Sequence, residues 1–207
     1  MYYDEFLASE EARVEYWDFK LETWAIYRHA RPNAVHHAVV ALERAGKVVA
    51  LVTQNVDGLH RRAGTSPNLL VELHGTDLLV ECQTCHATSD PAPHFEAFNA
   101  TRRPPACACG GPLKPATISF GQDLRSEDLR RAEAAAHQAD LVIALGSSLS
   151  VYPAAGIPLV AARRRVPYVI INRGPTDHDE LPEVSLRREG DVSEIFPQAV
   201  AEALRNS

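Results

Sequence analysis

The fold is decided by the stretch Val48-Val49-Ala50-Leu51-Val52-Thr53-Gln54-Asn55-Val56-Asp57-Gly58. Its first half is apolar and β-branched, and its second half changes abruptly to amides, a carboxylate and a glycine. An apolar run that ends in turn-forming residues is typical of a buried parallel strand. In open α/β sheets, ligands bind outside the carboxyl ends of the strands. We therefore expect Gln54, Asn55 and Asp57 to face a ligand.

Two more apolar runs have the same character. Leu141–Leu145 ends in Gly146-Ser147-Ser148, and Tyr168–Ile171 ends in Asn172-Arg173-Gly174-Pro175. Helices are expected between and around the three strands, over 5–30, 33–45, 126–137, 154–164 and 192–204. Alternation of strands and helices predicts an α/β fold with a mostly parallel sheet. Three polar strand ends on one edge of this sheet favour a ligand crevice over three unrelated turns.

Length and composition exclude several classes of protein. The 207 residues suffice for one large domain or for a main domain with a small appendage. The net charge of −6 argues against nucleic-acid binding, which needs a surplus of Lys and Arg. No stretch approaches the roughly 20 apolar residues of a membrane span. The acidic start, Met1–Glu5, does not resemble a signal peptide.

The four cysteines all lie within residues 76–115, a segment that has several prolines and no long periodic run. They form two pairs, Cys82-x-x-Cys85 and Cys107-x-Cys109, followed by Gly110-Gly111. Two short pairs can supply four thiolates to one tetrahedral zinc ion, which leaves no position for water and makes the site structural. Free or redox-active thiols are the alternative, and the nearby His86 or His94 could replace a cysteine. Zinc-binding thiols suit a reducing compartment, so we predict a cytoplasmic protein.

Taken together, the motifs resemble those of the sirtuin family of NAD-dependent protein deacylases. The residues that carry the resemblance occur in the family's order from about residue 31 onward: Thr53-Gln54-Asn55-Val56-Asp57-Gly58-Leu59-His60, Leu73-His74-Gly75-Thr76, the two Cys pairs, 115–122, Leu145-Gly146-Ser147-Ser148-Leu149 and Ile171-Asn172. The resemblance implies a Rossmann-like NAD-binding domain at 31–75 and 116–207. It implies a small domain made of a helical part at 1–30 and a zinc ribbon at 76–115.

The family's chemistry assigns a role to His74. In that chemistry an acyl-lysine oxygen attacks the nicotinamide ribose of NAD, nicotinamide leaves, and the acyl group ends as O-acyl-ADP-ribose. By position, His74 resembles the histidine that deprotonates a ribose hydroxyl, and an ordinary imidazole pKa near 6.5 suits that task. Without the resemblance, His74 would be interpreted as a loop histidine beside a glycine turn.

The resemblance also implies the residues that contact NAD. Those expected at the nicotinamide, ribose, phosphate and adenine portions are Gln54, Asn55, Val56, Asp57, Gly146, Ser147, Ser148, Asn172, Arg173, Gly174, Asp191 and Val192. Simpler explanations exist for two of the groups. Gln54–Asp57 could be a turn that closes a strand. Asp191 with Glu194 could form a helix N-cap and capping box.

An acyl-lysine protein or peptide is the implied partner. Phe120 and Gly121 resemble the wall of the acyl-lysine channel, and main-chain groups near Leu149 and Val151 would pair with the peptide as an added strand. Family members that prefer acidic acyl groups carry a Tyr-x-x-Arg pair, at whose positions Trp17 and Lys20 stand here. A lysine lacks the bidentate fork of arginine, so we expect acetyl or a longer neutral acyl group.

The sequence departs from the family in one respect. The family opens with a strand and a glycine-rich loop that holds the pyrophosphate through backbone N–H groups. Nothing in residues 1–30 resembles that loop, and the first glycine is Gly46. Two alternatives to the deacylase therefore stay open: a catalytically impaired module that binds NAD or ADP-ribose, and a mono-ADP-ribosyltransferase.

Overall fold

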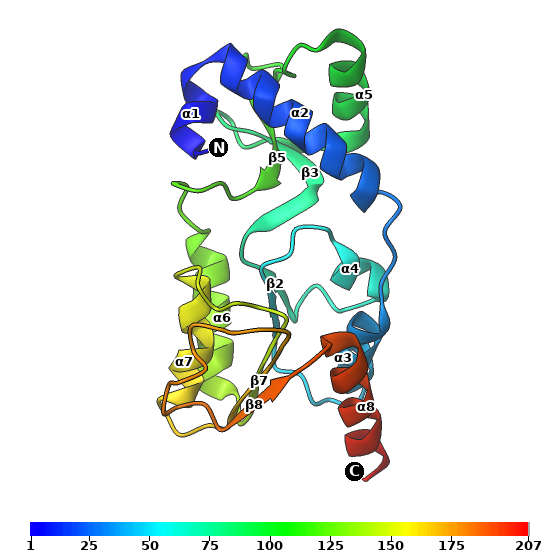
Figure 1. Ribbon diagram of the computed structural model, residues 1–207. Coiled ribbons are helices and arrows are strands. Elements are labelled where there is room, and N and C mark those ends of the chain that lie inside the picture. The colour runs from blue at the N-terminus through cyan, green and yellow to red at the C-terminus, as the bar shows by residue number, and fades with distance from the viewer. Residues whose placement is uncertain (207) are drawn as a thin grey trace. The chain divides into compact units, whose positions relative to one another are not determined.

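The computed structural model describes residues 1–206, which form two compact units (Figure 1). Unit 1 comprises Met1–Arg31, Thr53–Gly58 and His74–Arg125. Unit 2 comprises Pro32–Val52, Leu59–Leu73 and the residues from Ser126 onward. The predicted boundaries of an NAD-binding domain and a zinc-ribbon module stay a prediction.

Two helices stand where one was expected at the start of unit 1. These are α1 (Tyr3–Ala8) and α2 (Glu10–Tyr27). Ser9 separates them, because its extended backbone ends α1 and its hydroxyl accepts the Ala12 N–H at 3.1 Å to cap α2. Side-chain oxygens of serine satisfy free N–H groups at helix starts, which is why the break falls at this residue.

The sheet of unit 1 is antiparallel and has three strands. β3 (Gly75–Cys82) lies between β4 (Thr88–Ser89) and β5 (Leu113–Thr117). A helix, α5 (Pro91–Thr101), follows β4, and the expectation of no long helical run in 76–115 is wrong there. Asp90 caps α5 by accepting the Ala92 N–H at 2.8 Å. Proline is tolerated in a first helical turn, so this proline-containing stretch can be a helix.

Aromatic side chains fill the core of unit 1. The Trp17 indole is fully buried, donates from Nε1 to the Leu113 carbonyl at 3.1 Å, and meets the rings of Phe95 and Phe98. Helices α2 and α5 thereby cover the sheet that β3 and β5 form (Figure 1).

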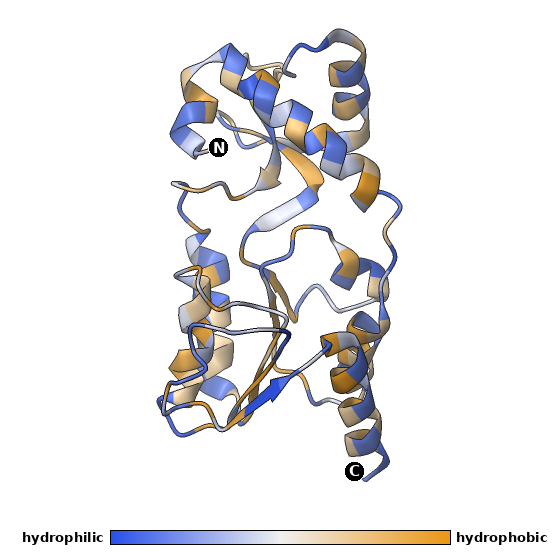
Figure 2. Cartoon of the chain, in the orientation of Figure 1, coloured by the Kyte–Doolittle hydropathy of each residue, from blue (hydrophilic) through white to orange (hydrophobic). Residues whose placement is uncertain are grey.

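The main sheet of unit 2 is parallel, as predicted. β6 (Val142–Leu145), β7 (Tyr168–Asn172) and β8 (Leu186–Glu189) lie in that order, with Leu145 opposite Ile171. β8 was not expected, because its sequence Leu-Arg-Arg-Glu has no apolar run; Figure 2 shows it as a hydrophilic strand. Pairing with β7 forms this strand in spite of its composition.

Helices cover both faces of β7, which is mostly buried. β6 contains no buried residue and its Ile143 is 37% exposed, so the prediction of a buried strand is wrong for β6. Ile170 of β7 packs in one cluster with Leu159 of α7 (Ile157–Ala162), which follows a short 3₁₀ turn at Ala154–Gly156 and contacts α6 (Ser126–Gln138). The next residue, Ile171, packs in a second cluster with α3 (Ala34–Arg44) and α8 (Val192–Arg205). Successive strand residues point to opposite faces, so an apolar strand has to be covered twice. The α/β class is confirmed.

The first predicted strand is paired differently from the expectation. β1 (Leu51–Thr53) forms a separate two-stranded sheet with β2 (Leu70–Glu72), and α4 (Leu59–Ala63) lies between them in sequence. The Leu51 N–H donates to the Leu69 carbonyl at 2.8 Å, at the start of this pairing. The expectation that three strand ends share one edge of one sheet is therefore wrong for β1 and correct for β6 and β7.

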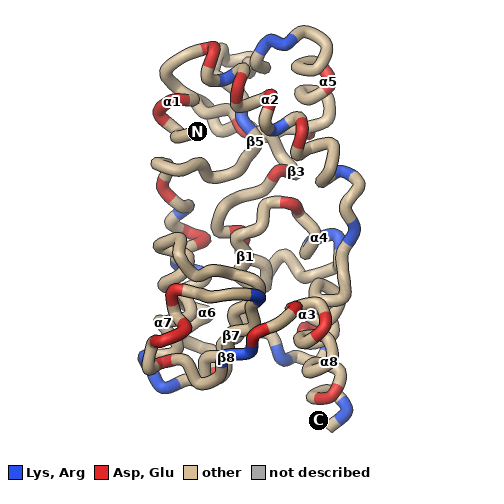
Figure 3. The backbone as a smooth tube through the Cα atoms, in the orientation of Figure 1, with Lys and Arg blue, Asp and Glu red and all other residues tan. Residues whose placement is uncertain are grey.

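Charges of both signs are mixed along the chain. Figure 3 shows Lys and Arg interspersed with Asp and Glu in both units. Arg163 to Arg165 follow the end of α7, where cations suit the helix dipole. In the described residues 1–206, no helix is long and apolar enough to cross a membrane.

Replacing the buried indole tests the aromatic core. Trp17→Ala removes the largest fully buried side chain and should lower the free energy of unfolding by about 3–5 kcal/mol in urea titrations. Phe19→Ala is the matched control on the same helix, because Phe19 is 61% exposed and should change stability by less than about 1 kcal/mol. Equal effects of the two substitutions would contradict this packing.

Candidate functional site

In unit 1, the loop after β1 is joined to the start of β3 and to the residue before it, His74. The Asp77 N–H donates to the Val56 carbonyl at 2.8 Å, and the His74 imidazole makes a hydrogen bond with the backbone of Gln54. The Thr53 hydroxyl accepts the Asn55 N–H at 3.1 Å, so the loop is also a turn that closes a strand. The turn and the predicted site are thus compatible, since the turn presents Gln54–Asp57 beside His74.

A glycine holds the backbone in place next to His74. Gly75 has φ +74°, and a Cβ on it would lie 2.1 Å from the Ala116 carbonyl oxygen. The His74 carbonyl accepts the Ile118 N–H at 2.8 Å. Only glycine allows this approach of β3 to β5, and the approach sets the position of the preceding histidine.

Burial tunes the His74 imidazole. The side chain is half-buried, and loss of solvent lowers its pKa from the ordinary value, opposed by the hydrogen bond with Gln54. A histidine with a lowered pKa is neutral at pH 7 and can accept a proton. The arrangement can therefore supply a general base.

A buried ion pair includes Asp77, whose N–H bonds the same loop. Lys20 Nζ lies 2.8 Å from Asp77 Oδ1, and the two side chains are 11% and 5% exposed. Lys114 is also buried nearby, where desolvation and the charge of Lys20 lower its pKa to about 7, opposed by the charge of Asp77. Lys20 and Asp77 are 57 positions apart in the sequence, and no sequence pattern indicated this pair.

The predicted channel wall is exposed. Phe120 is 67% exposed, and its carbonyl accepts the Tyr3 N–H at 2.8 Å. The rings of Phe120 and Tyr2 are 6.3 Å apart, and Gly121 follows in the left-handed region with φ +81°. An apolar aromatic surface is thus available next to a sharp turn.

In unit 2, the carboxyl ends of β6 and β7 bring two loops together. The Gly146 N–H donates to the Ile171 carbonyl at 3.0 Å, and the Ser148 carbonyl accepts the Asp177 N–H at 2.9 Å. The Ser147 hydroxyl accepts the Leu149 N–H at 3.1 Å and stabilises Leu149 in its left-handed conformation. Leu149 is buried, whereas Val151 is 39% exposed.

The remaining predicted residues of unit 2 lie at the end of β7 and the start of α8. The Arg173 guanidinium forms an ion pair with Asp191, and Asp191 caps α8 by accepting the Ser193 N–H at 2.8 Å. Hydrogen bonds from Ser193, with the charge of Arg173, lower the pKa of Asp191. Val192 Cγ2 would lie 3.7 Å from a Cβ on Gly146. The capping role of Asp191 is therefore observed, and its role toward a cofactor stays a prediction.

The four cysteines converge on one point. Their Sγ atoms all lie within 4.8 Å of one another, with Cys82 to Cys109 at 3.5 Å and Cys85 to Cys107 at 3.8 Å. Thiolates around a tetrahedral zinc at the usual Zn–S length stand about 3.8 Å apart, so the four fit one structural zinc ion. The two histidines have other partners, because His86 bonds Glu81 and His94 bonds Ser89.

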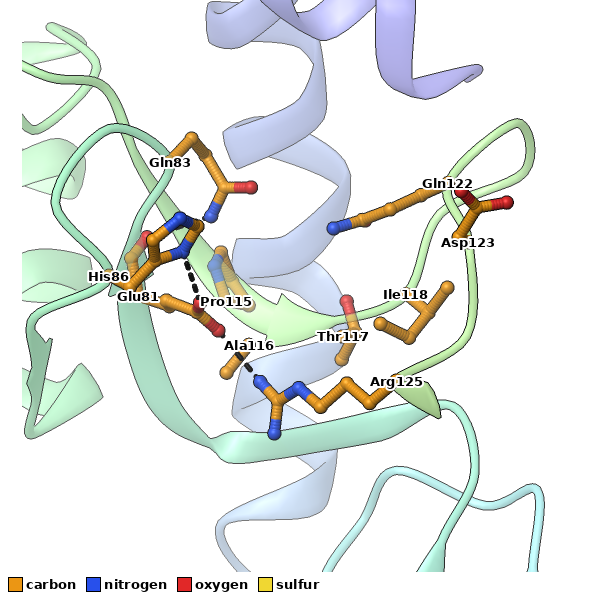
Figure 4. Close-up of a pocket in the computed structure, with 10 residues that line it drawn as sticks. All are labelled: Glu81, Gln83, His86, Pro115, Ala116, Thr117, Ile118, Gln122, Asp123 and Arg125. Carbon is orange, nitrogen blue, oxygen red and sulfur yellow. Dashed lines mark hydrogen bonds and ion pairs between the residues drawn. The ribbon is translucent and has the colours of Figure 1, made fainter. Parts of the chain in front are cut away.

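Unit 1 also contains a polar pocket of about 240 Å³ (Figure 4). In it the Glu81 carboxylate lies 3.0 Å from His86 Nδ1 and 2.7 Å from Arg125. Thr117, Ile118 and Gln122 line one side, and none of the predicted cofactor residues contributes to it. Two of its lining residues, Ile118 and Gln122, are close to Phe120 in the sequence. The pocket is distinct from the His74 site, because His74 does not line it.

The amino-acid sequence matches a known protein family. Residues 2–153 match the model of the Sir2 family. The chain belongs to the Sir2 family, which is the sirtuin family of the sequence motifs. It is 41% identical over 187 residues to NAD-dependent protein deacetylase 1 of Bradyrhizobium diazoefficiens, covering 90% of this chain and 74% of that protein.

Solved structures of Sir2 proteins are also similar to this chain. The structure of Sir2Tm bound to a propionylated peptide has a TM-score of 0.88 and 33% identity, covering 100% of this chain and 84% of that chain. Another, Sir2 bound to acetylated peptide, has a TM-score of 0.89 and 32% identity, with 100% and 83% covered.

Removal of a thiolate tests the metal site of the Sir2 chain. Cys82→Ser should reduce bound zinc from one ion per chain to well below one and lower the melting temperature, because a structural zinc contributes folding energy. Metal analysis of the purified proteins measures the first effect. His94→Ala is the control and should keep one zinc, since His94 bonds Ser89. A zinc-free unsubstituted protein would rule the site out.

Proposed function

We propose that this protein is an NAD-dependent protein-lysine deacylase that releases nicotinamide and O-acyl-ADP-ribose. One observation carries the proposal: the half-buried His74 lies against the Gln54–Asp57 loop in a chain 41% identical to a deacetylase. A module that only binds NAD has no use for a general base at this position. The ADP-ribosyltransferase alternative has no specific observation in its favour.

Two sets of residues would bind NAD. When bound, NAD supplies a reactive nicotinamide ribose carbon that the acyl oxygen can attack. In unit 1, the amides of Gln54 and Asn55 can hold the carboxamide and ribose hydroxyls, and Asp57 can orient them. In unit 2, Gly146, Ser147 and Ser148 would bind the ribose and phosphate side. Asn172, Arg173, Gly174, Asp191 and Val192 would bind the adenosine side.

His74 would act as the general base. Its neutral imidazole would accept the proton of a ribose hydroxyl of bound NAD. The bond with the backbone of Gln54 orients the ring, and burial lowers the pKa so that the base form dominates at neutral pH. Burial and the bond with Gln54 would thus supply the base in its reactive form.

An acyl-lysine peptide would be the substrate. The exposed ring of Phe120 can cover the aliphatic part of an acyl-lysine, and Gly121 leaves room beside it. Backbone groups near Leu149 and Val151 would add the peptide as a strand. The acetylated and propionylated peptides in two similar Sir2 structures support this substrate class.

The acyl group would be neutral. Of the two residues at the places of the acid-binding Tyr-x-x-Arg pair, Trp17 donates its indole N–H to the Leu113 carbonyl. Lys20 is paired with Asp77 in the core of unit 1. Both donors are therefore engaged, and an acyl carboxylate would have to displace a buried ion pair.

We also propose a cytoplasmic location. The four cysteines converge on one metal site as thiols, and such thiolate sites persist in reducing compartments.

Substitution of the base tests the reaction. His74→Ala should lower peptide-dependent release of nicotinamide from NAD by about 10²–10⁴-fold, because proton abstraction loses its acceptor. The acid limb of the kcat/KM profile of the unsubstituted protein should fall at a pH below 6.5, since protonation of His74 removes the base and burial lowers its pKa. His29→Ala replaces an exposed histidine of unit 1 and should leave both measurements unchanged.

Absence of peptide-dependent release by the unsubstituted protein would end the deacylase proposal. Release that transfers ADP-ribose to the peptide, detected by mass spectrometry, would support the transferase instead.

Matched peptides test the acyl preference. The protein should deacylate an acetyl-lysine peptide at least about tenfold faster, in kcat/KM, than the same peptide with succinyl-lysine, because Lys20 is held by Asp77. Asp77→Asn removes the competing charge and should narrow this ratio. A preference for the succinyl peptide would show that Lys20 leaves its partner.

A further inference from the structure

A single arginine of unit 2 binds the loop that follows β7. Arg187, on β8, donates from Nη1 to the Asn172 carbonyl at 3.1 Å and from Nη2 to the Gly174 carbonyl at 2.5 Å. Its Nε donates to Asp179 Oδ1 at 2.8 Å. One planar guanidinium therefore joins three acceptors of the same segment, and its side chain is 20% exposed.

Asp179 closes the other end of this segment. Its carboxylate accepts the Thr176 N–H at 3.0 Å and the Thr176 hydroxyl at 2.5 Å, besides the bond from Arg187. The Asn172 amide donates to the Gly174 carbonyl at 3.1 Å. Residues 172–179 thus form one hydrogen-bonded loop with Arg187 at its centre.

This loop also reaches the serine segment after β6. The Asp177 N–H donates to the Ser148 carbonyl at 2.9 Å. A change at Arg187 can therefore be transmitted to both polar loops of unit 2. The route runs directly to Asn172 and Gly174, and through Asp177 to Ser148.

We propose that Arg187 is a positioning residue for the adenosine half of NAD. Arg187 positions this half of NAD by fixing the backbone of Asn172–Gly174 and the contact of Asp177 with Ser148. This inference rests on the proposed function, which assigns those two loops to NAD.

The geometry of the side chain explains why arginine is needed. The fork of a guanidinium can donate to two carbonyls and a carboxylate at once, and a lysine keeps the charge but supplies one nitrogen. Replacing Arg187 by lysine therefore keeps the positive charge but removes the bonds that fix the loop, so the two contributions can be separated. The neighbouring strand residue, Arg188, is exposed and offers a matched control.

Binding of ADP-ribose, measured by calorimetry, tests the inference without relying on catalysis. Arg187→Lys should raise the Kd for ADP-ribose by about tenfold, because the loops lose their fixed geometry. Arg188→Lys should leave the Kd within about twofold of the unsubstituted value. In kinetics, Arg187→Lys should raise the KM for NAD and leave the KM for the acetyl-lysine peptide unchanged.

A second measurement uses the ligand-free protein. In Arg187→Lys, the Asp177 amide, which bonds the Ser148 carbonyl, should exchange its hydrogen faster, while amides of α8 keep their rates. Asp179→Asn removes the charge that faces Arg187 but keeps the arginine and its bonds to the two carbonyls, so it should give a smaller change of the same kind.

The outcomes separate the two proposals. Equal Kd values for the unsubstituted protein and Arg187→Lys would overturn the inference and leave the proposed function standing. Equal loss of affinity in both lysine variants would overturn it too. Failure of the unsubstituted protein to bind ADP-ribose would overturn the proposed function and this inference together.

Discussion

The hydrogen bond from the Asp77 N–H to the Val56 carbonyl is the contact on which the predicted active site depends. It fixes the loop after β1 against the start of β3, so that Gln54–Asp57 and His74 become neighbours. Asp77 is itself held by Lys20, and Gly75 lets β3 pass close to Ala116. The polar side chains of the loop therefore owe their arrangement to residues that do not contact a substrate in our proposal.

Burial has two different consequences in this unit. At His74 it is partial, and it lowers the pKa of the ring that our proposal makes the general base. At Lys20 and Asp77 it is nearly complete, and each charge requires the other, because an isolated charge in the core would be costly. In our proposal, the first effect favours the neutral form of the base, and the second keeps Lys20 from binding the acyl group of the substrate. The ion pair of the second effect joins α2 to β3.

In unit 2, the parallel register of β6 and β7 plays the role that the bond between Asp77 and Val56 plays in unit 1. Leu145 stands opposite Ile171, so the loops after the two strands start at the same level. The register alone does not shape those loops, and the hydrogen bonds of Arg187, Asp179 and Asp177 do so. A strand of low hydrophobicity, β8, thus contributes to the proposed cofactor site through one side chain.

The sequence by itself determined the α/β class, the positions of the parallel strands β6 and β7, and the paired cysteines. Each rests on a local pattern: an apolar run ended by turn residues, or two thiols a turn apart. The family motifs also singled out His74 and the polar strand ends, whose roles stay proposals. The sequence did not reveal α5, β8, the separate pairing of β1 with β2, or the contacts of Lys20 and Arg187. Only the tertiary structure decided these. The strand pairings and side-chain contacts depend on partners distant in the chain, which leave no periodicity in the residues that make them. Helix α5 was missed for a local reason, because its first turn contains prolines.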